Sequence, residues 1–285
     1  MVLYRYTAAK WGIAILLNLC VRITPPNEFN DPFEFTPTAV NPLNHSDQLN
    51  DYLRQQGEDS SVESLQKVNP VLRKNNQIAS GFGQFLTNTD MTSLSVASQK
   101  LGVVCLSKLK DDIRMWGHYG DKHKGVAIGL DFNREVDGIN GVIALEPVRY
   151  KKYRARLNPM LEQQSNEWHQ EMLNASLTKS REWRHEREYR MVCRLCDFKE
   201  ELRKQRGKIM INRFVIIGPE TVREVILGCL INGKDEAVIR RLCASKLPYA
   251  RLTKMVCHPT EFDLVATVAK NFVVERQKRT DSSKR

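Results

Sequence analysis

The chain has 285 residues, 41% of them hydrophobic, which is enough to bury a large core in one domain or in two smaller ones. Lysine and arginine total 44 against 33 acidic residues, and the net charge of +11 is compatible with a polyanionic partner. The longest apolar run near the N-terminus, residues 11–21, is interrupted by Gly12 and Asn18 and is too short to span a bilayer, so we expect a buried helix there and no membrane partner.

The first part of the chain predicts a strand, a helix and a second strand. Residues 2–7 alternate and are rich in aromatic side chains, which is typical of a strand. Residues 8–19 then predict a helix, with Thr7 as its possible N-cap. A short strand at residues 21–24 ends at a Pro-Pro pair, because proline cannot donate to a sheet.

The segment NEFNDPFEF, residues 27–35, carries a strong turn signal at Asn30 and Asp31. Three aromatic side chains around the turn are expected to clamp the loop onto the body of the protein: Phe29, Phe33 and Phe35. The Asn-Asp pair then either displays polar groups into a pocket or forms a plain Asx turn. The local sequence does not distinguish these two interpretations.

Residues 41–100 are polar and predict a peripheral helical insertion of two or three short helices. After this insertion, residues 101–107 predict a buried strand that ends in the hydroxyl of Ser107. A short helical turn at residues 111–115 connects this strand to the next stretch.

Residues 115–132 combine a cluster of ring side chains with a following apolar run, residues 126–132, of strand length. The rings are Trp116, His118, Tyr119 and His123, and glycines among them permit tight turns and close approach. Such rings at the mouth of a strand suit a planar ligand. An aromatic mini-core that closes one end of a sheet is the alternative, and both remain open.

Beyond this stretch, residues 142–150 predict one or two strands, and residues 151–182 predict a helical segment with its helix at 159–176. Within the next informative stretch, residues 183–196, the side chains from Glu188 to Leu195 alternate with strand periodicity. Glu186 and Glu188 lie at the start of this strand on its polar side. A surface salt-bridge ladder with the arginines at 187 and 190 is the alternative interpretation of the pair.

The seven cysteines show no disulfide-framework spacing, which favours a reducing, cytoplasmic location. Cys193 and Cys196 form a lone CxxC without a second pair or a nearby His pair, so we expect core thiols and no metal.

The rest of the chain predicts strands and one helix, and then a charged tail at residues 276–285 that we expect to be disordered. We expect residues 1–275 to form a single domain. Residues 149–213 contain 17 basic and 9 acidic residues, which gives +8 of the net charge, so this segment predicts either a nucleic-acid contact or a solvated helix face. The expected elements are strands at 214–217, 224–230, 252–257 and 262–269, and a helix at 235–245.

Four stretches in order along the chain resemble the bacterial family catalogued as domain of unknown function 2971, which is related to abortive-infection proteins. They are FNDPFEF preceded by Glu28, VVCLS, MWGHYGDKHKG and EWRHEREYR. Leu106 stands in the second stretch where the family pattern leads us to expect phenylalanine. The resemblance implies no activity by itself.

The layout also resembles the ADP-ribosyltransferase fold. That fold implies a first strand with His or Arg, here Arg5, then a central strand with Ser or Tyr, and a last strand that begins with a catalytic glutamate, here Glu188. The EREYR run is similar to the Glu-x-Glu element of several transferases and to the glutamate that opens the last core strand of DNA-modifying toxins of the DarT type. The resemblance implies an α+β fold with a mixed or antiparallel β core of split sheets and peripheral helical insertions.

We therefore expect an enzyme that transfers ADP-ribose from NAD, without a metal, to nucleic acid or protein, acting as a toxin or phage-defence effector with a possible antitoxin or defence partner. The alternative is a non-catalytic basic module that binds nucleic acid or a partner protein. A metal-free nuclease is disfavoured. The expected catalytic residues are Glu188, Glu186 and Tyr119, and the expected NAD contacts are Arg5, Tyr6, Asn30, Asp31, Ser107, Trp116, His118, His123 and Arg190.

Overall fold

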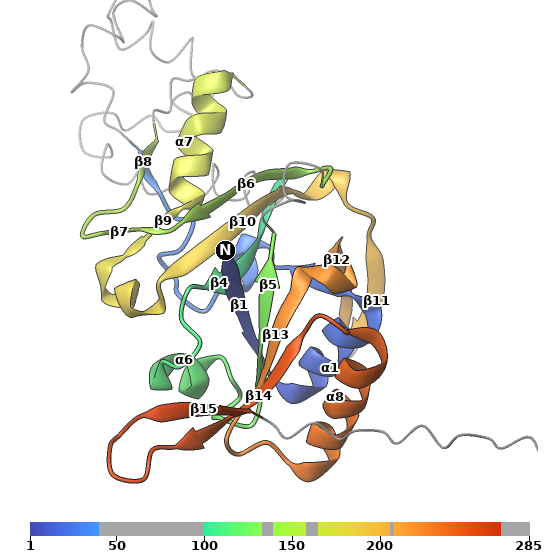
Figure 1. Ribbon diagram of the computed structural model, residues 1–285. Helices are drawn as coiled ribbons and strands as arrows, with labels where there is room; N and C mark the ends of the chain where they lie inside the picture. The colour runs from blue at the N-terminus through green and yellow to red at the C-terminus, as the bar shows by residue number, and fades with distance from the viewer. Residues whose placement is uncertain (40–99, 133–138, 158–164, 206–207, 269–285) are drawn as a thin grey trace, which may run out of the picture.

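A computed structural model describes residues 1–39, 100–132, 139–157, 165–205 and 208–268. Its centre is an eight-stranded sheet in the order β15-β14-β13-β5-β1-β4-β10-β6, with helices packed against it (Figure 1). All neighbouring pairs in this sheet are antiparallel except β13 and β14, which are parallel. The fold class is α+β with a mixed sheet, as the sequence predicted.

The elements of the central sheet and its helices follow the expected order closely. The strands are β1 (Val2–Thr7), β4 (Leu101–Ser107), β5 (Val126–Asp131), β6 (Val142–Pro147), β10 (Glu188–Arg194), β13 (Val222–Leu227), β14 (Arg251–Cys257) and β15 (Leu264–Val268), and the helices are α1 (Ala9–Asn18), α6 (Ile113–His118), α7 (Asn166–Ser176) and α8 (Gly233–Lys246).

Smaller elements surround this sheet. A second sheet has the order β11 (Glu201–Gln205), β12 (Lys208–Ile216) and β2 (Cys20–Ile23), and two parallel pairs join β3 (Thr38–Ala39) to β8 (Arg156–Leu157) and β7 (Arg149–Lys151) to β9 (Thr178–Ser180). Four 3-10 turns complete the described chain: η1 (Pro26–Glu28), η4 (Arg181–Glu186), η5 (Leu195–Asp197) and η6 (Pro219–Thr221).

The main core lies between the sheet and the helices α1 and α8, which pack on each other beside it (Figure 1). Leu16 of α1 and Ile239 of α8 are fully buried against Leu3 of β1 and Ile128 of β5. The close approach of α1 requires Gly12, because a Cβ there would come within 2.2 Å of Cγ2 of Val126. A smaller core on the opposite face of the sheet gathers the tyrosines of β1 around Trp116.

The sheet is weakly joined between β1 and β4. Only Tyr4 and Ser107 face each other as backbone partners there, whereas β1 and β5 pair along six residues. The side chain of Arg5 crosses the opening instead, and its Nη1 donates to the carbonyl of Cys105 at 2.9 Å. The two strands therefore diverge, and side chains rather than a backbone ladder line the space between them.

Several expected boundaries need correction. Ala8, and not Thr7, is the N-cap of α1, and no side chain caps it. β12 begins six residues before the expected strand at 214, and β11 was not expected at all. The helix of the segment 151–182 begins at Asn166, capped by Ser165, and short strands flank it. The expected helical insertion at 41–100 and the tail at 276–285 lie outside the described residues, apart from Lys100.

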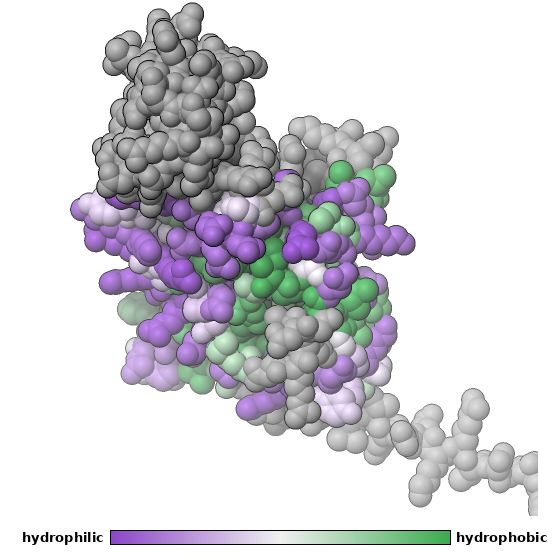
Figure 2. All heavy atoms as spheres, turned by 90° about the horizontal axis from the view of Figure 1, so that it is seen from above, coloured by the Kyte–Doolittle hydropathy of each residue, from purple (hydrophilic) through white to green (hydrophobic). Residues whose placement is uncertain are grey.

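Figure 2 shows one face of the molecule, where hydrophilic residues cover much of the visible coloured surface and hydrophobic side chains gather nearer its centre. Among the helices that the structure describes, none has the length and apolar character needed to cross a membrane.

Candidate functional site

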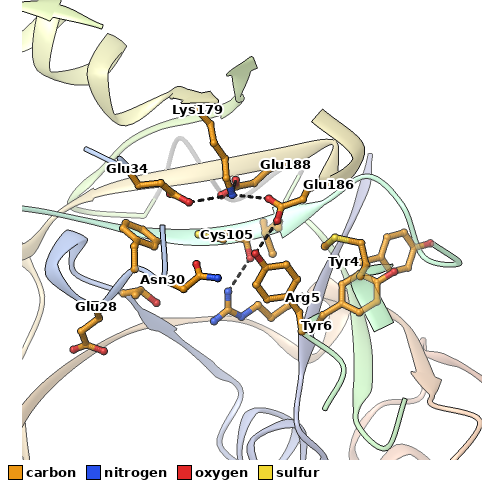
Figure 3. Close-up of a pocket in the computed structure, with 15 residues that line it drawn as sticks. Tyr4, Arg5, Tyr6, Glu28, Asn30, Glu34, Cys105, Lys179, Glu186 and Glu188 are labelled. Carbon is orange, nitrogen blue, oxygen red and sulfur yellow. Dashed lines mark hydrogen bonds and ion pairs between the residues drawn. The ribbon is translucent and has the colours of Figure 1, made fainter. Parts of the chain in front are cut away.

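The opening between β1 and β4 contains a cavity of about 360 Å³ (Figure 3). Its walls come from segments far apart in the sequence: β1, the loop after η1, β4, the end of α6, β9, η4 and β10. The residues that line it are Tyr4, Arg5, Tyr6, Thr24, Glu28, Phe29, Asn30, Glu34, Cys105, Leu106, Met115, Tyr119, Lys179, Glu186 and Glu188. Six of them were predicted as site residues.

Lys179 is the centre of a buried charged cluster on one wall of the cavity (Figure 3). Its ammonium nitrogen lies 2.6 Å from Oε2 of Glu186, 3.0 Å from Oε2 of Glu188 and 3.1 Å from Oε1 of Glu34. All four side chains are at most 6% exposed. Three carboxylates thus share one ammonium group in a site shielded from solvent.

Arg190 forms the layer behind this cluster. Its Nε donates to Oε1 of Glu188 at 2.8 Å, and its guanidinium also binds Glu34 and the carbonyl of Ser176. The rings of Phe29 and Phe35 lie 5.5 and 5.6 Å from the guanidinium carbon. The side chain is fully buried, fixes Glu188 in position and does not line the cavity, so the expected direct NAD contact of Arg190 is corrected.

Glu186 is positioned by a tight turn that precedes β10. It ends the 3-10 turn η4, and the next residue, Arg187, has the left-handed backbone angle φ of 42° that redirects the chain into β10. The hydroxyl of Ser107 donates to the carbonyl of Glu186 at 2.6 Å and accepts from the amide of Leu109 at 3.0 Å. The phenol of Tyr119 donates to Oε1 of Glu186 at 2.7 Å.

The cluster shifts the pKa values of its members in opposite directions. Burial alone raises the pKa of Glu188, but Arg190 and Lys179 outweigh it and lower that pKa to about 2. Burial lowers the pKa of Lys179, and the three carboxylates more than reverse this, so its pKa lies well above the ordinary value. Burial dominates at Glu34 and raises its pKa despite both cations. Glu188 and Lys179 are therefore charged at neutral pH.

Arg5 differs from the other cations of the site, because no carboxylate among the described residues lies within ion-pair distance of it. Its guanidinium carries several N–H donors, and within the described ranges only Nη1 has a hydrogen-bond partner, the carbonyl of Cys105. Figure 3 shows this guanidinium and the amide of Asn30 within the cavity, across from the carboxylates. One wall thus presents acceptors and the other presents free donors.

Two predicted site residues, Asp31 and Ser107, do not line the cavity and instead form hydrogen bonds that hold the neighbouring backbone. Asp31 is buried, and its Oδ1 accepts from the amide of Phe33 at 2.9 Å, which is an Asx turn. Only its neighbour Asn30 reaches the cavity. Ser107 is also buried, with its hydroxyl fully used by the η4 turn and by Leu109.

The ring cluster is divided between core, surface and cavity, so the prediction that all four rings line one pocket is corrected. Trp116 is fully buried, with its indole N–H on the carbonyl of Lys110 and its ring edge-on to Tyr6. His118 is exposed at the end of α6. His123 closes a turn with φ of 66°. Tyr119 alone among the four lines the cavity.

Sequence reasoning missed Lys179 and Glu34, which complete the charged cluster. A charged residue between two phenylalanines in FNDPFEF is a signal for Glu34, because such a position is expected to be buried with a partner. Lys179 has no comparable local signal. The surface salt-bridge ladder that we had kept as an alternative is wrong, because Glu186, Glu188 and Arg190 are all buried.

The comparison with known families gives one match. Residues 115–191, from α6 to β10, match the profile of a family described as protein of unknown function (DUF2971). The match supports the resemblance that the four motifs indicated, over a part of the chain that contains Tyr119, Lys179, Glu186 and Glu188. No curated protein matches the chain, and no solved structure matches it.

The cavity holds carboxylates but no arrangement typical of a metal centre. Among the described residues, no group of three or more His, Cys, Asp or Glu side chains is placed to hold an ion. The three glutamates around Lys179 instead have an ammonium where a metal would bind.

Proposed function

We propose that the protein binds NAD in this cavity and transfers its ADP-ribose group to a macromolecule. The observation that carries the proposal is the separation of charge across the cavity. Glu186 and Glu188 present carboxylates on one wall, and Arg5 presents on the other a guanidinium that forms no ion pair with the described residues. NAD has the complementary pattern, with a cationic nicotinamide ring at one end and a pyrophosphate between its two ribose units.

The chemistry uses the two glutamates in different roles. The bond between the nicotinamide nitrogen and C1′ of the ribose breaks with its electron pair leaving on nicotinamide, and C1′ gains oxocarbenium character. We assign the stabilisation of this positive charge to the carboxylate of Glu188. A hydroxyl or amine of the acceptor then bonds to C1′, and we assign its proton to Glu186.

The surrounding residues support these roles. Glu188 begins β10 and is fixed by Arg190, Lys179 and the phenol of Tyr150, which accepts from its amide at 2.8 Å. Such fixed geometry is what electrostatic stabilisation of a transition state requires. Tyr119 orients Glu186 through its 2.7 Å hydrogen bond, and Arg5 is the proposed pyrophosphate ligand.

Nicotinamide release from NAD by the purified protein tests the proposal directly. We expect Glu188→Gln to lower the rate at least about 100-fold, because it removes the charge that faces C1′. Glu186→Gln is expected to keep NAD hydrolysis and lose transfer of labelled ADP-ribose to a cell lysate. Glu224→Gln is the matched control, because Glu224 is also a buried glutamate with a hydrogen bond, from Tyr4, but lies outside the cavity lining.

Circular dichroism and urea unfolding would establish that each variant is folded. A folded Glu188→Gln protein with full nicotinamide release would rule out this mechanism. No release from the unaltered protein with any acceptor would favour the second candidate below.

The second candidate is a non-catalytic binding module, and one observation favours it. Both oxygens of Glu188 and one oxygen of Glu186 are engaged by cations, as in a structural ion cluster. In that case the basic segment of residues 149–213 binds a polyanion while the cavity is inert. Salt-dependent nucleic-acid binding without nicotinamide release would distinguish it.

The cellular setting is part of the same proposal. All seven cysteines are free thiols, which supports a reducing cytoplasm. The role as a toxin or phage-defence effector rests on the family resemblance, and comparing phage plating on cells with the unaltered gene and with Glu188→Gln tests it.

A further inference from the structure

A second hollow, of about 290 Å³, lies beside the candidate active site and shares Lys179 with it. We call it the basic groove. Its walls are Phe33 and residues 35–37 at and after the Asx turn, residues 151–155 from the end of β7 toward β8, and residues from the end of α7 and from β9. Apart from Lys179, the residues that line the groove differ from those that line the candidate active site, and the proposed NAD reaction does not use them.

The groove has an excess of unpaired positive charge. Lys151, Lys152 and Arg154 line it, and all three are exposed. None of the three forms an ion pair with any residue that the structure describes. Arg154 is held in place because its Nη1 donates to the carbonyl of Thr36 at 3.2 Å. The lining contains no acidic side chain.

Two exposed aromatic rings accompany these cations. Phe33 is 64% exposed and Tyr153 is 71% exposed, although large rings normally contribute to a core. The expectation that Phe33 clamps its loop is therefore wrong, whereas Phe29 and Phe35 do stack on each other, with centroids 5.5 Å apart. The ammonium of Lys152 lies 5.3 Å from the centre of the Tyr153 ring, so charge and ring face are presented together.

We propose that the basic groove binds single-stranded nucleic acid, with phosphates on the lysines and Arg154 and with bases stacked on Phe33 and Tyr153. Cations that track a backbone and open rings that accept bases are the two components of single-strand recognition. A duplex keeps its bases stacked on each other, so it offers nothing to the exposed rings. Binding of single-stranded nucleic acid does not depend on catalysis. Only the idea that the bound nucleic acid accepts ADP-ribose rests on the proposed function.

Fluorescence anisotropy with labelled oligonucleotides of about 15 nucleotides tests the inference, since single-strand sites extend over roughly 4–16 nucleotides. The probes are a single-stranded DNA, an RNA of the same sequence, the matched DNA duplex and a poly-glutamate peptide, each measured without NAD over a range of salt concentrations. We expect the single-stranded probes to bind more tightly than the duplex and the peptide. Comparing the affinities for the DNA and RNA single strands shows which of the two the groove prefers.

Two groups of variants separate charge from stacking. Lys151→Ala with Lys152→Ala is expected to weaken binding and to reduce the slope of log K against log salt by about 1.4, at about 0.7 per lost phosphate contact. Tyr153→Ala is expected to weaken binding about 10-fold with the salt slope unchanged, because stacking contributes about 1–3 kcal/mol per base. Matched controls are Lys234→Ala and Tyr249→Ala, both exposed and away from the groove, the latter 63% exposed.

Equal binding of the duplex, or Tyr153→Ala binding as tightly as Tyr249→Ala, would overturn the inference. Because these titrations contain no NAD, absent strand binding with normal nicotinamide release would reject the groove alone. Strand binding without any nicotinamide release would reject the proposed chemistry alone.

Discussion

Replacing Lys179 with methionine tests whether the charged cluster holds the cavity wall together. The Lys179 side chain is 3% exposed, and its ammonium nitrogen lies within 3.1 Å of three carboxylate oxygens. With all three carboxylates ionised, the two cations leave the cluster a net charge of −1, and the substitution changes this to −2 with one cation, Arg190, left. Among the described residues, the carboxylate of Glu186 would then keep only the hydrogen bond from the phenol of Tyr119.

The expected loss of unfolding free energy is about 3–5 kcal/mol, the usual effect of removing one partner from a buried ion pair. The gross attraction is larger, about 4 kcal/mol for each pair at 4 Å and an effective dielectric constant of 20, but the cost of burying the ammonium offsets much of it. Urea unfolding at pH 7, followed by tryptophan fluorescence, measures the difference. Lys254→Met is the control, because Lys254 pairs with Glu236 at 2.7 Å but is 29% exposed, and its loss is expected to cost about 1 kcal/mol or less.

A second substitution provides a sharper check. Glu34→Gln added to Lys179→Met removes one of the stranded charges, so the double variant is expected to regain part of the lost stability. Equal midpoints for Lys179→Met and Lys254→Met, or no recovery in the double variant, would refute the reasoning.

Two further predictions concern the same wall. Because the pKa of Glu188 is lowered to about 2 in the folded protein, its stabilising effect is complete above its ordinary value of 4.5 and is lost as pH falls from there toward 2. Urea unfolding midpoints measured at decreasing pH should therefore become equal for the wild-type protein and Glu188→Gln. A difference between the two midpoints that stays constant with pH would contradict this. Ser107→Ala strands the amide of Leu109 and should cost about 1–3 kcal/mol, whereas an unchanged midpoint would show that the hydroxyl is dispensable.

Much of the sheet was predictable because its strands alternate or are continuously apolar. Alternation predicted β10, although Glu186, expected at the start of this strand, lies in η4 and the strand begins at Glu188; β1, β4 and β5 followed from runs bounded by polar turns. β11 was not predictable in this way, because ELRKQ contains a single large apolar residue and its partner β12 supplies the pattern.

The candidate site was only half predictable, for a physical reason. Glu186 and Glu188 are two residues apart, and their shared direction is a local property. Lys179 meets them only because η4 folds back after β9, and Glu34 arrives from a loop over 150 residues earlier in the chain. Trp116 was misplaced because a ring beside glycines resembles a ligand platform, whereas its indole N–H finds a carbonyl inside the core.

The position of β1 in the middle of the sheet has a consequence for synthesis. Its ladder with β5 joins Thr7 to Val126, 119 residues further along, so β1 leaves the ribosome long before that partner. At about 5–20 residues per second this interval is roughly 6–24 s. During that time an aromatic, strand-forming segment has both edges open, which is the condition that favours aggregation and chaperone capture. Long-range pairing of this kind also makes folding slow, so nascent chains stalled before residue 126 are expected to be captured by chaperones more readily than chains that have released β5.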